Sequence, residues 1–552
     1  MIEKIEITVG KSKIKVTKGT TLEELATNFQ DDFKYRIILG KVNGQIRELS
    51  YHLIDNAEVE FFDLTSSQGN RIYINGLVFI LIYAIKSLYG KKADVSIEHS
   101  LDKGLYCETN FKLTPARLKD VFNKMKETIE LNLPIKKELV DRLETIEYYN
   151  EIGDYEKSKV LRYNTNTYVT LYRLGNLYDY FYSQMPTESS MIEKFELTYV
   201  EDNGFVLRFP TIYSPDKITP YVHHPHMFDV FNECREWAKI MKITTSNDLN
   251  ELVSKYRVGD LIKIDETLQS NRLLSVAETI NDKKRRIKIV LIAGPSSSGK
   301  TTTSKKLCMY LESFGLHPKV LSMDDFFVER NETPKDKDGK YDYECLEAVD
   351  LKLFDKTIAN LLDGKETKIP TYDFILGTKS FANTLKMDDK DILVIEGIHA
   401  LDKKVLSNIP KEKKFKIYIS PLTELNIDTH NRISTTDCRL LRRIVRDART
   451  RGRSVEDSIK TWPSVRSGEE KYIFPCQDEA DVTINTALIY ELGVLRTYVE
   501  PLLYDVPTDS PVYEEAKRLL KFIRLFLPIP SDAVPQDSIL REFIGGSYFY
   551  NK

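Results

Sequence analysis

The chain has 552 residues, 41% of them hydrophobic and 30% charged, and its 80 Lys and Arg against 83 Asp and Glu leave a net charge of −3. This length predicts about three domains, and this composition excludes a mostly disordered protein. The near-neutral charge excludes a global attraction to nucleic acid or to an anionic membrane, so any site for a polyanion must be local.

The sequence shows no targeting signal and no cysteine motif. Its six cysteines are scattered without a CxxC pair, which argues against a disulfide framework and a zinc ribbon. The N-terminus lacks the charged and then apolar layout of a secretion signal. The longest apolar run, 77–85, has nine residues, whereas about 20 are needed to cross a bilayer. We therefore expect reduced thiols and a cytoplasmic location.

Residues 1–64 predict a small β-grasp sheet that holds one helix. Apolar residues alternate by twos around Gly10-Lys11, which indicates a hairpin. A helix is expected over 21–29, because Thr20 or Thr21 can cap its first turn. Further strands are expected at 37–39 and 59–62, on either side of a turn at Asn43-Gly44.

Residues 65–242 predict a second, α+β domain. A long apolar helix at 77–88 is combined with strands rich in Tyr and Thr at 167–172 and 205–209. The next segment, 243–285, is largely helical and polar, and we expect it to connect two bodies.

Residues 286–552 predict a doubly wound α/β sheet with a C-terminal extension. Short apolar runs separated by stretches of helical period are typical of buried parallel strands with crossover helices. The expected strands are 287–293, 319–322, 392–395, 415–419 and 482–484.

The strongest motif is a GxxxxGK[ST] loop that follows an expected strand and precedes an expected helix at 302–313. Its backbone N–H groups can surround a β-phosphate, and Lys300 can reach the β and γ oxygens. The hydroxyl of Thr301 is expected to hold Mg²⁺. GTPases, motor ATPases and small-molecule kinases all share this loop. The expected ATP contacts are Gly294, Pro295, Ser296, Ser297, Ser298, Gly299, Lys300, Thr301 and Thr302.

Two carboxylates at expected strand ends suggest which of these classes applies. Asp324 follows one strand, where doubly wound sheets bind ligands, and it could accept the proton of an attacking hydroxyl. Helix capping or a solvated strand end would also explain the pair Asp324-Asp325. Glu396 ends another strand, in a position suited to Mg²⁺ or its waters.

An arginine-rich stretch at 439–453 has seven arginines in 15 residues. On a helix, Arg439, Arg442 or Arg443, and Arg446 share one face. A row of guanidinium groups suits the charge on a transferring phosphoryl group. A basic surface helix or an RNA contact is the alternative; together with the upstream loop, a lid that closes over ATP is the interpretation we favour.

The stretch 286–484 resembles the uridine kinase and phosphoribulokinase family. The motifs that carry the resemblance are the P-loop, Ser322-Met323-Asp324, Tyr341-Asp342, Pro370-Thr371-Tyr372-Asp373-Phe374, Glu396-Gly397-Ile398, Arg443/Arg446/Arg451-Gly452 and Ala480-Asp481-Val482. The resemblance implies an enzyme that uses ATP and Mg²⁺ to phosphorylate the 5′-hydroxyl of uridine or cytidine.

The resemblance also implies a role for each matching residue. Asp324 would be the base, acting with Lys300 and Arg446 as the catalytic set. Arg446 and Arg451 would contact the ATP phosphates, while Thr301 and Glu396 hold the metal. The substrate site would comprise Asp324, Asp342, Tyr372, Asp373 and Arg443.

The N-terminal half resembles parts of threonyl-tRNA synthetase. Residues 1–64 look like its TGS domain, and 65–242 look like its editing domain through Lys103-Gly104-Leu105-Tyr106-Cys107-Glu108 and the helix that ends at 84–89. The metal ligands of that domain align with Asn75, Phe79, Phe181 and Met185, so we expect neither metal nor editing chemistry there.

A second departure concerns the acceptor. Uridine kinases place a histidine against the pyrimidine shortly after the Tyr-Asp-Phe triplet, whereas Ile375-Leu376-Gly377 follows it here. Kinase action on another small polyol or sugar is therefore an alternative. A further alternative is an RNA-binding regulatory P-loop ATPase whose N-terminal half binds tRNA. We also expect a homo-oligomer.

Three smaller features leave alternatives open. The cluster His223-His224-Pro225-His226 suits a surface turn better than a metal site, because it contains proline and lacks a Cys or acidic partner. His399 could contact substrate or cap a loop. The stretch 541–547 could bring backbone donors to an anion, although a docked C-terminal turn is the simpler interpretation.

Overall fold

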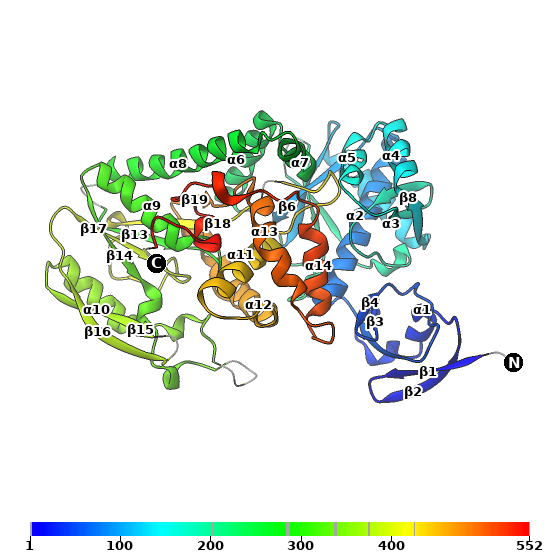
Figure 1. Cartoon of the computed structure of the whole chain (residues 1–552), viewed down its shortest axis with the longest axis horizontal. Helices are drawn as coiled ribbons and strands as arrows, with labels where there is room; N and C mark the ends of the chain where they lie inside the picture. Colours follow the sequence, from blue (N-terminus) through cyan, green and yellow to red (C-terminus); the bar gives the residue numbers. More distant parts are fainter. Residues whose placement is uncertain are drawn as a thin grey trace.

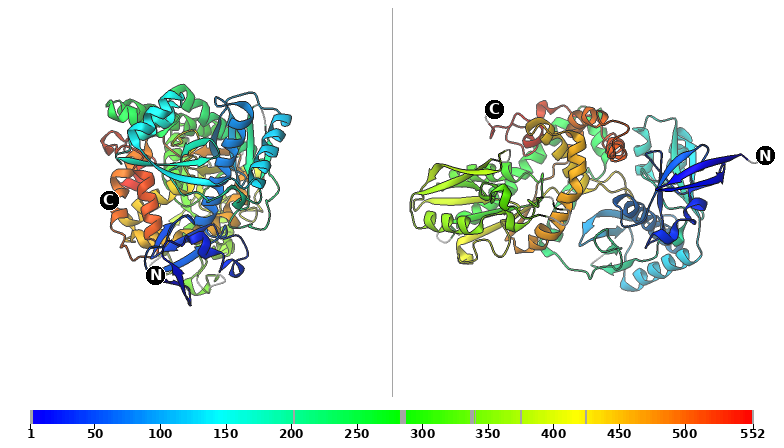
Figure 2. Two further views of the ribbon diagram at one scale, coloured as in Figure 1. Left: turned by 90° about the vertical axis from the view of Figure 1, so that its right-hand side faces the viewer. Right: turned by 90° about the horizontal axis from the view of Figure 1, so that it is seen from below.

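The fold is described from a computed structural model, which describes residues 3–200, 203–282, 287–335, 339, 341–373, 376–423 and 425–550. Arg286, Phe374, Ile375 and the end of the expected connector, 283–285, lie outside these residues. The N-terminal part and the last, parallel sheet lie at opposite ends of the molecule in two perpendicular views, and the C-terminal helices lie between them (Figures 1 and 2).

The first sheet has five strands in the order β2-β1-β5-β3-β4. Strands β1 and β5 pair in parallel, and the other neighbours pair antiparallel. Helix α1 (Leu22–Ala26) begins with a capping box between Thr21 and Glu24 and ends three residues before the predicted end. The strands are β1 (Lys4–Val9), β2 (Ser12–Thr17), β3 (Leu39–Val42), β4 (Gln45–Arg47) and β5 (Ala57–Phe62).

The second region combines helices with two antiparallel sheets, as the α+β pattern predicts. One sheet has the order β11-β12-β7-β6 and the other β10-β9-β8. The elements are α2 (Ser67–Tyr89), β6 (Val95–Leu101), β7 (Gly104–Thr109), α3 (Pro115–Glu130), β8 (Ile135–Asp141), α4 (Arg142–Glu151), α5 (Tyr155–Arg162), β9 (Tyr168–Leu174), β10 (Leu177–Tyr180), β11 (Glu196–Tyr199) and β12 (Gly204–Arg208).

Helix α2 starts ten residues before the predicted helix, because Ser66 caps it by accepting a hydrogen bond from the Gly69 amide. In the described part of the chain it is the one helix long and apolar enough to cross a membrane, and 61% of its most apolar window is buried inside the protein. Its apolar residues belong to a core that also includes residues of the first sheet. Packing in that core accounts for its composition.

Three helices lead from the second region to the last one. They are α6 (Pro225–Met241), α7 (Ser246–Ser254) and α8 (Val258–Asp282). Helix α7 begins with a capping box between Thr245 and Asp248. The long helix α8 runs along one side of the molecule and contacts α9 (Lys300–Ser313) (Figure 1).

The sheet of the last region has five parallel strands, one at each predicted position. Their order is β14-β17-β13-β18-β19. Alternate residues of β13 enter two different apolar clusters, one on each face of the sheet, so the sheet is covered on both sides. The strands are β13 (Ile289–Ala293), β14 (His317–Ser322), β17 (Asp391–Glu396), β18 (Lys414–Ser420) and β19 (Val482–Asn485).

The remaining elements surround this sheet. The antiparallel hairpin of β15 and β16 has no counterpart among the predicted strands. The elements are α10 (Leu351–Leu362), β15 (Thr367–Asp373), β16 (Thr378–Leu385), α11 (Thr435–Thr450), α12 (Val455–Gly468), α13 (Glu491–Tyr504), α14 (Tyr513–Ile523) and α15 (Arg541–Ile544).

A buried ion cluster joins the N-terminal half to the sheet domain. The Lys157 amine lies 2.8 Å from Asp179 and 3.0 Å from Asp428. The two ring nitrogens of His430 lie 2.6 Å from Asp179 and 2.8 Å from Asp94. Burial opposes the charged imidazole, but Asp179 and Asp94 outweigh it and raise the pKa of His430 to about 10. The cluster therefore holds a charged histidine between the two halves.

We predict that His430→Gln destabilises the protein by about 3 to 5 kcal/mol, because removing one partner leaves a buried charge uncompensated. The pKa of His430 is higher in the folded protein than in the unfolded chain. Its contribution to the stability of the fold is therefore complete below pH ~6.5 and is lost as the pH rises toward 10. Thermal unfolding across this range should show a decline in the wild type and a weaker one in the variant. The exposed substitution His317→Gln serves as the control, and equal slopes in His430→Gln and wild type would contradict the prediction.

Candidate active site

The P-loop has the backbone geometry that its glycines permit. Gly299 and Ser297 adopt φ values of 87° and 60°, in the left-handed region. A Cβ on Gly294 would lie 2.2 Å from the carbonyl oxygen of Ile419, so the loop passes too close to β18 for any side chain there. The loop ends directly in α9, and the amides at a helix N-terminus attract an anion.

The loop carries polar groups that a phosphate could satisfy. In the described part of the chain, the buried hydroxyls of Ser297 and Ser298 have no hydrogen-bond partner. Unpaired buried hydroxyls are costly unless a ligand or water completes them. With the glycine turn and the helix terminus, they fit a nucleotide phosphate.

Lys300 points back at its own loop. Its amine donates to the carbonyl oxygens of Gly294, at 2.9 Å, and Pro295, at 3.1 Å. Burial lowers the pKa of Lys300, and the charges of Glu396 and Asp324 oppose that shift. To reach the β and γ oxygens, the amine must exchange these carbonyls for phosphate oxygens.

The two predicted carboxylates meet beside Lys300. Ser322 pairs with Glu396 across the parallel strands β14 and β17. Its hydroxyl donates to Glu396, at 2.8 Å, and accepts from the Asp324 amide, at 3.3 Å. Burial raises the pKa of Glu396 to about 7, and the charge of Asp324 adds to this. Desolvation likewise raises the pKa of Asp324, against the opposing charge of Lys300.

Helix α11 is a fixed element rather than the predicted lid. Arg439 and Arg442 are among the largest fully buried side chains. Arg439 donates to the Ser296 carbonyl at 3.0 Å and pairs with Glu469, which itself accepts from the Ser296 amide at 2.9 Å. Arg442 donates to the Thr486 carbonyl at 2.8 Å. The helix therefore braces the P-loop through its first two arginines.

The arginines predicted to contact ATP and ribose gather on one buried carboxylate. Asp447, whose side chain is fully buried, lies 3.4 Å from Arg443, 2.8 Å from Arg446 and 3.6 Å from Arg451. Arg443 also donates to the Ser296 hydroxyl at 3.2 Å. Asp447 thus keeps three guanidinium groups together beside the loop, and the sequence analysis did not identify it.

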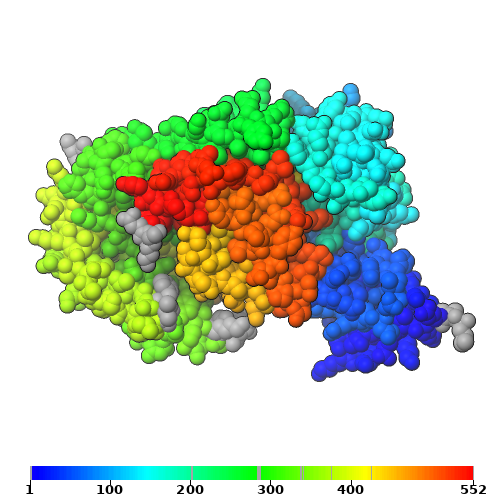
Figure 3. All heavy atoms as spheres, viewed as in Figure 1, coloured from blue at the N-terminus to red at the C-terminus, as the bar shows by residue number. Residues whose placement is uncertain are grey.

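The C-terminal segment contacts the start of α9. The Glu542 carboxylate accepts from the amide and the hydroxyl of Thr302, at 3.2 and 2.8 Å. The Tyr550 hydroxyl lies 3.4 Å from the same hydroxyl, and the Phe549 carbonyl accepts from Lys305 at 3.0 Å. The docked turn predicted for 541–547 is present, and Figure 3 shows the red C-terminal surface against the green part of the sheet domain. An internal carboxylate therefore occupies donors that we expect to bind ATP.

Of the predicted acceptor residues, Tyr372 and Asp373 end strand β15 and Asp342 lies in a loop earlier in the chain. Asp324 and Arg443 lie beside Lys300 and the P-loop instead. Asp342 accepts from the Glu344 amide at 3.0 Å, and Asp373 from the Leu376 amide at 2.9 Å. Tyr372 is buried and packs edge-on against Phe327. A Cβ on Gly377 would lie 2.7 Å from the guanidinium of Arg330. The Arg330 cation therefore lies beside Gly377, where the sequence departs from uridine kinases. The sequence did not point to this arginine.

Both histidine features contact other residues of the fold. The expected lack of an acidic partner for the first cluster is wrong: His224, which precedes α6, lies 2.7 Å from Asp478 and 3.5 Å from Asp102. His399 is buried beside Tyr472, and burial lowers its pKa to about 4. Across the described residues, no group of three or more His, Cys, Asp and Glu side chains is arranged to hold a metal ion.

Comparisons with known proteins agree with this geometry. Residues 289–489 match the model of the "Phosphoribulokinase / Uridine kinase family". Over 197 residues the chain is 32% identical to a protein named uridine kinase from Staphylococcus aureus strain JH9, covering 36% of this chain and 86% of that relative. Uridine kinase of strain Newman matches equally.

Among solved structures, one described as a possible uridine kinase from Bacillus stearothermophilus is 21% identical, with a TM-score of 0.26 and coverage of 39% of this chain and 98% of that one. D-glycerate 3-kinase from Cryptococcus neoformans is 15% identical, with a TM-score of 0.23 and coverage of 48% and 89%.

The parallel sheet, the P-loop and the carboxylates at its edge define a P-loop kinase domain in the C-terminal half. The chain belongs to the phosphoribulokinase and uridine kinase family. Its members' chemistry makes it a phosphotransferase that uses ATP, usually with Mg²⁺.

We predict that Glu542→Gln lowers the Kd for ATP by roughly 3- to 10-fold, because the nucleotide must displace a charge-assisted hydrogen bond that the amide makes less strongly. Calorimetric titration with a non-hydrolysable ATP analogue measures the change. Glu312→Gln, at the exposed far end of α9, is the matched control. An unchanged or weakened affinity in Glu542→Gln would contradict the competition.

Proposed function

We propose that this protein transfers the γ-phosphoryl group of ATP to the 5′-hydroxyl of a nucleoside, uridine or cytidine. The observation that carries the proposal is the convergence of Lys300, Asp324 and Glu396 at the carboxyl edge of the parallel sheet, next to a loop with unsatisfied hydroxyls. Ligands bind at this edge in doubly wound folds, and the similarity to uridine kinases suggests the acceptor class.

In the proposed mechanism, the chain's residues position the reactants and neutralise charge. Asp324, with a pKa raised by desolvation, is suited to accept the proton of the acceptor hydroxyl as that oxygen attacks phosphorus. Lys300 stabilises the charge on the transferring phosphoryl oxygens. Arg443, Arg446 and Arg451, grouped around Asp447, supply further positive charge.

The residues present fit a magnesium ion bound together with the nucleotide. Thr301 and Glu396 would hold it, because hydroxyl and carboxylate oxygens are the ligands Mg²⁺ prefers. When bound, the ion would neutralise negative charge on the nucleotide phosphates.

We predict that Asp324→Ala reduces kcat by about 10² or more, the usual contribution of a general base, while ATP binding stays nearly intact. Steady-state turnover and nucleotide titration separate the two effects. Asp325→Asn is the control: Asp325 accepts from the Tyr372 amide at 3.3 Å, and an amide oxygen can still do so. Turnover in Asp324→Ala within a few-fold of wild type would remove Asp324 from this role.

The acceptor is tested by incubating the purified protein with ATP and a panel of nucleosides and sugars, followed by product analysis. We expect 5′-monophosphates of uridine and cytidine. Arg330 beside Gly377 favours a second candidate, a small polyol or sugar that does not need the histidine of uridine kinases. A phosphorylated sugar with no nucleoside product would establish that second candidate and refute the first.

A further inference from the structure

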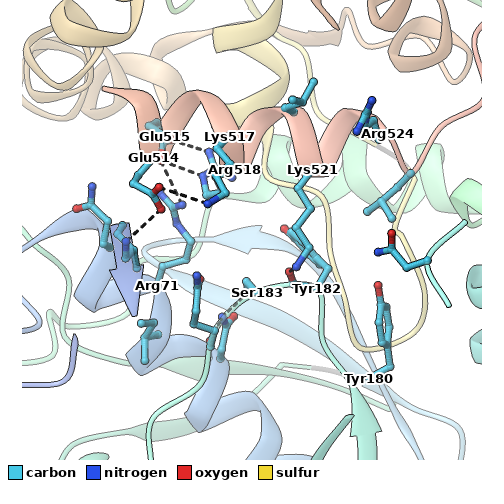
Figure 4. Close-up of a pocket in the computed structure, with 18 of the residues that line it drawn as sticks. Arg71, Tyr180, Tyr182, Ser183, Glu514, Glu515, Lys517, Arg518, Lys521 and Arg524 are labelled. Carbon is cyan, nitrogen blue, oxygen red and sulfur yellow. Dashed lines mark hydrogen bonds and ion pairs between the residues drawn. The ribbon is translucent and has the colours of Figure 1, made fainter. Parts of the chain in front are cut away.

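A cavity of about 480 Å³ lies between helix α14 and the N-terminal half. Its walls come from α2, the loop at 163–166, the segment at 180–184 and α14, with Leu39 and Ile46 of the first sheet at its edge (Figure 4). Cavities of this size hold small molecules. It is separate from the P-loop, Asp324 and Glu396, none of which lines it.

The lining of this cavity is strongly basic. It includes six Lys and Arg side chains against two Glu side chains, a net charge of +4. Arg518 binds Asp437, outside the lining, at 2.7 and 2.8 Å and Glu515, within it, at 2.7 Å, and Arg524 binds Glu500, outside the lining, at 2.7 Å. With Asp437 and Glu500 counted as well, the six basic groups still exceed the four carboxylates by two, which favours an anionic occupant. They are Arg47, Arg71, Lys517, Arg518, Lys521 and Arg524.

Lys521 is a cation of this lining whose partner is a backbone carbonyl and not a carboxylate. Its side chain extends from α14 toward Tyr182, and its amine donates to that residue's carbonyl (Figure 4). Among the described residues, no carboxylate lies within ion-pair distance of this amine. Lys521 is exposed at the mouth of the cavity, and partial desolvation, with the charges of Lys137 and Lys517, lowers its pKa to about 8, although Glu48 opposes the shift. An anion in the cavity would relieve this cost.

The wall opposite α14 offers groups that suit a polar organic body. Ser183 accepts from Asn75 at 2.6 Å and, as a hydroxyl, can still donate. Asn164 and Asn166 add amide groups, and the rings of Tyr163 and Tyr180 add flat surface. Hydroxyls and amides next to aromatic rings match a sugar or nucleoside better than a fatty chain.

We propose that this cavity binds a small phosphomonoester, a sugar phosphate or nucleoside monophosphate, with its phosphate on Lys521 and the neighbouring cations of α14. Arg518 in the same lining holds Asp437 in the first turn of α11, the helix that braces the P-loop. The site therefore adjoins the kinase domain without being part of its reaction centre.

The test is calorimetric titration of the full-length protein with ribose 5-phosphate and with UMP, using ribose, uridine and inorganic phosphate as comparison probes. The experiment is repeated in a Lys300→Ala background, in which phosphate binding at the P-loop is weakened, so the result does not depend on kinase activity. We expect at least one of the two esters to bind, more tightly than the three comparison probes. We expect Lys521→Gln to weaken it at least tenfold.

Lys521→Arg, which keeps the charge, should retain binding within a few-fold, and Lys255→Gln, in an exposed ion pair on another helix, should leave it unchanged. Thermal unfolding checks that each variant is folded. Equal binding by wild type and Lys521→Gln, or equal binding by uncharged probes, would overturn the proposal. Inorganic phosphate binding as tightly as the esters would overturn the claim of an organic ligand.

Discussion

The partly buried cation of the P-loop, Lys300, balanced by two carboxylates, is the interaction on which the site depends. Lys300 lies in a desolvated position where its charge is costly, and Asp324 and Glu396 compensate it. The same desolvation raises the pKa values of both acids. Lys300 favours the charged form of both acids, whereas the charge of Asp324 disfavours that of Glu396. A nucleotide and its metal would therefore enter a site whose charged groups are already in place.

Much of the surrounding structure keeps this arrangement rigid. Arg439 and Arg442 form hydrogen bonds with backbone carbonyls and ion pairs with internal acids. Asp447 holds three further arginines together. Glu542 takes up donors at the start of α9 that a phosphate would need. The Glu542 carboxylate thus competes with a bound phosphate for the Thr302 donors, although it lies about 240 residues away along the chain.

The N-terminal half is joined to the kinase domain by charges that neither half could bury alone. Lys157 and Asp179 come from one half, and Asp428 and His430 come from the other. The basic cavity beside α14 lies at the same junction. The resemblance of residues 1–242 to synthetase domains stays a prediction, and the junction gives this half a structural connection to the kinase that does not depend on it.

The local pattern of the sequence determined the elements of the kinase domain. Buried parallel strands are continuous apolar runs, and a glycine-rich turn before a helix has few other uses, so the five strands and the P-loop could be located from residue order alone. Asp324 and Glu396 followed, because the carboxyl ends of parallel strands share one edge.

Only the tertiary structure decided what depends on distant partners. Four features of the site and its surroundings involve residues far apart in the chain. They are the burial of Arg439 and Arg442, the contact of Glu542 with Thr302, the position of Arg330 beside Gly377 and the cavity beside α14. A charged residue looks the same in the sequence whether it is solvated, paired or aimed at a ligand. Its role is set by the partners and the dielectric environment that folding brings to it.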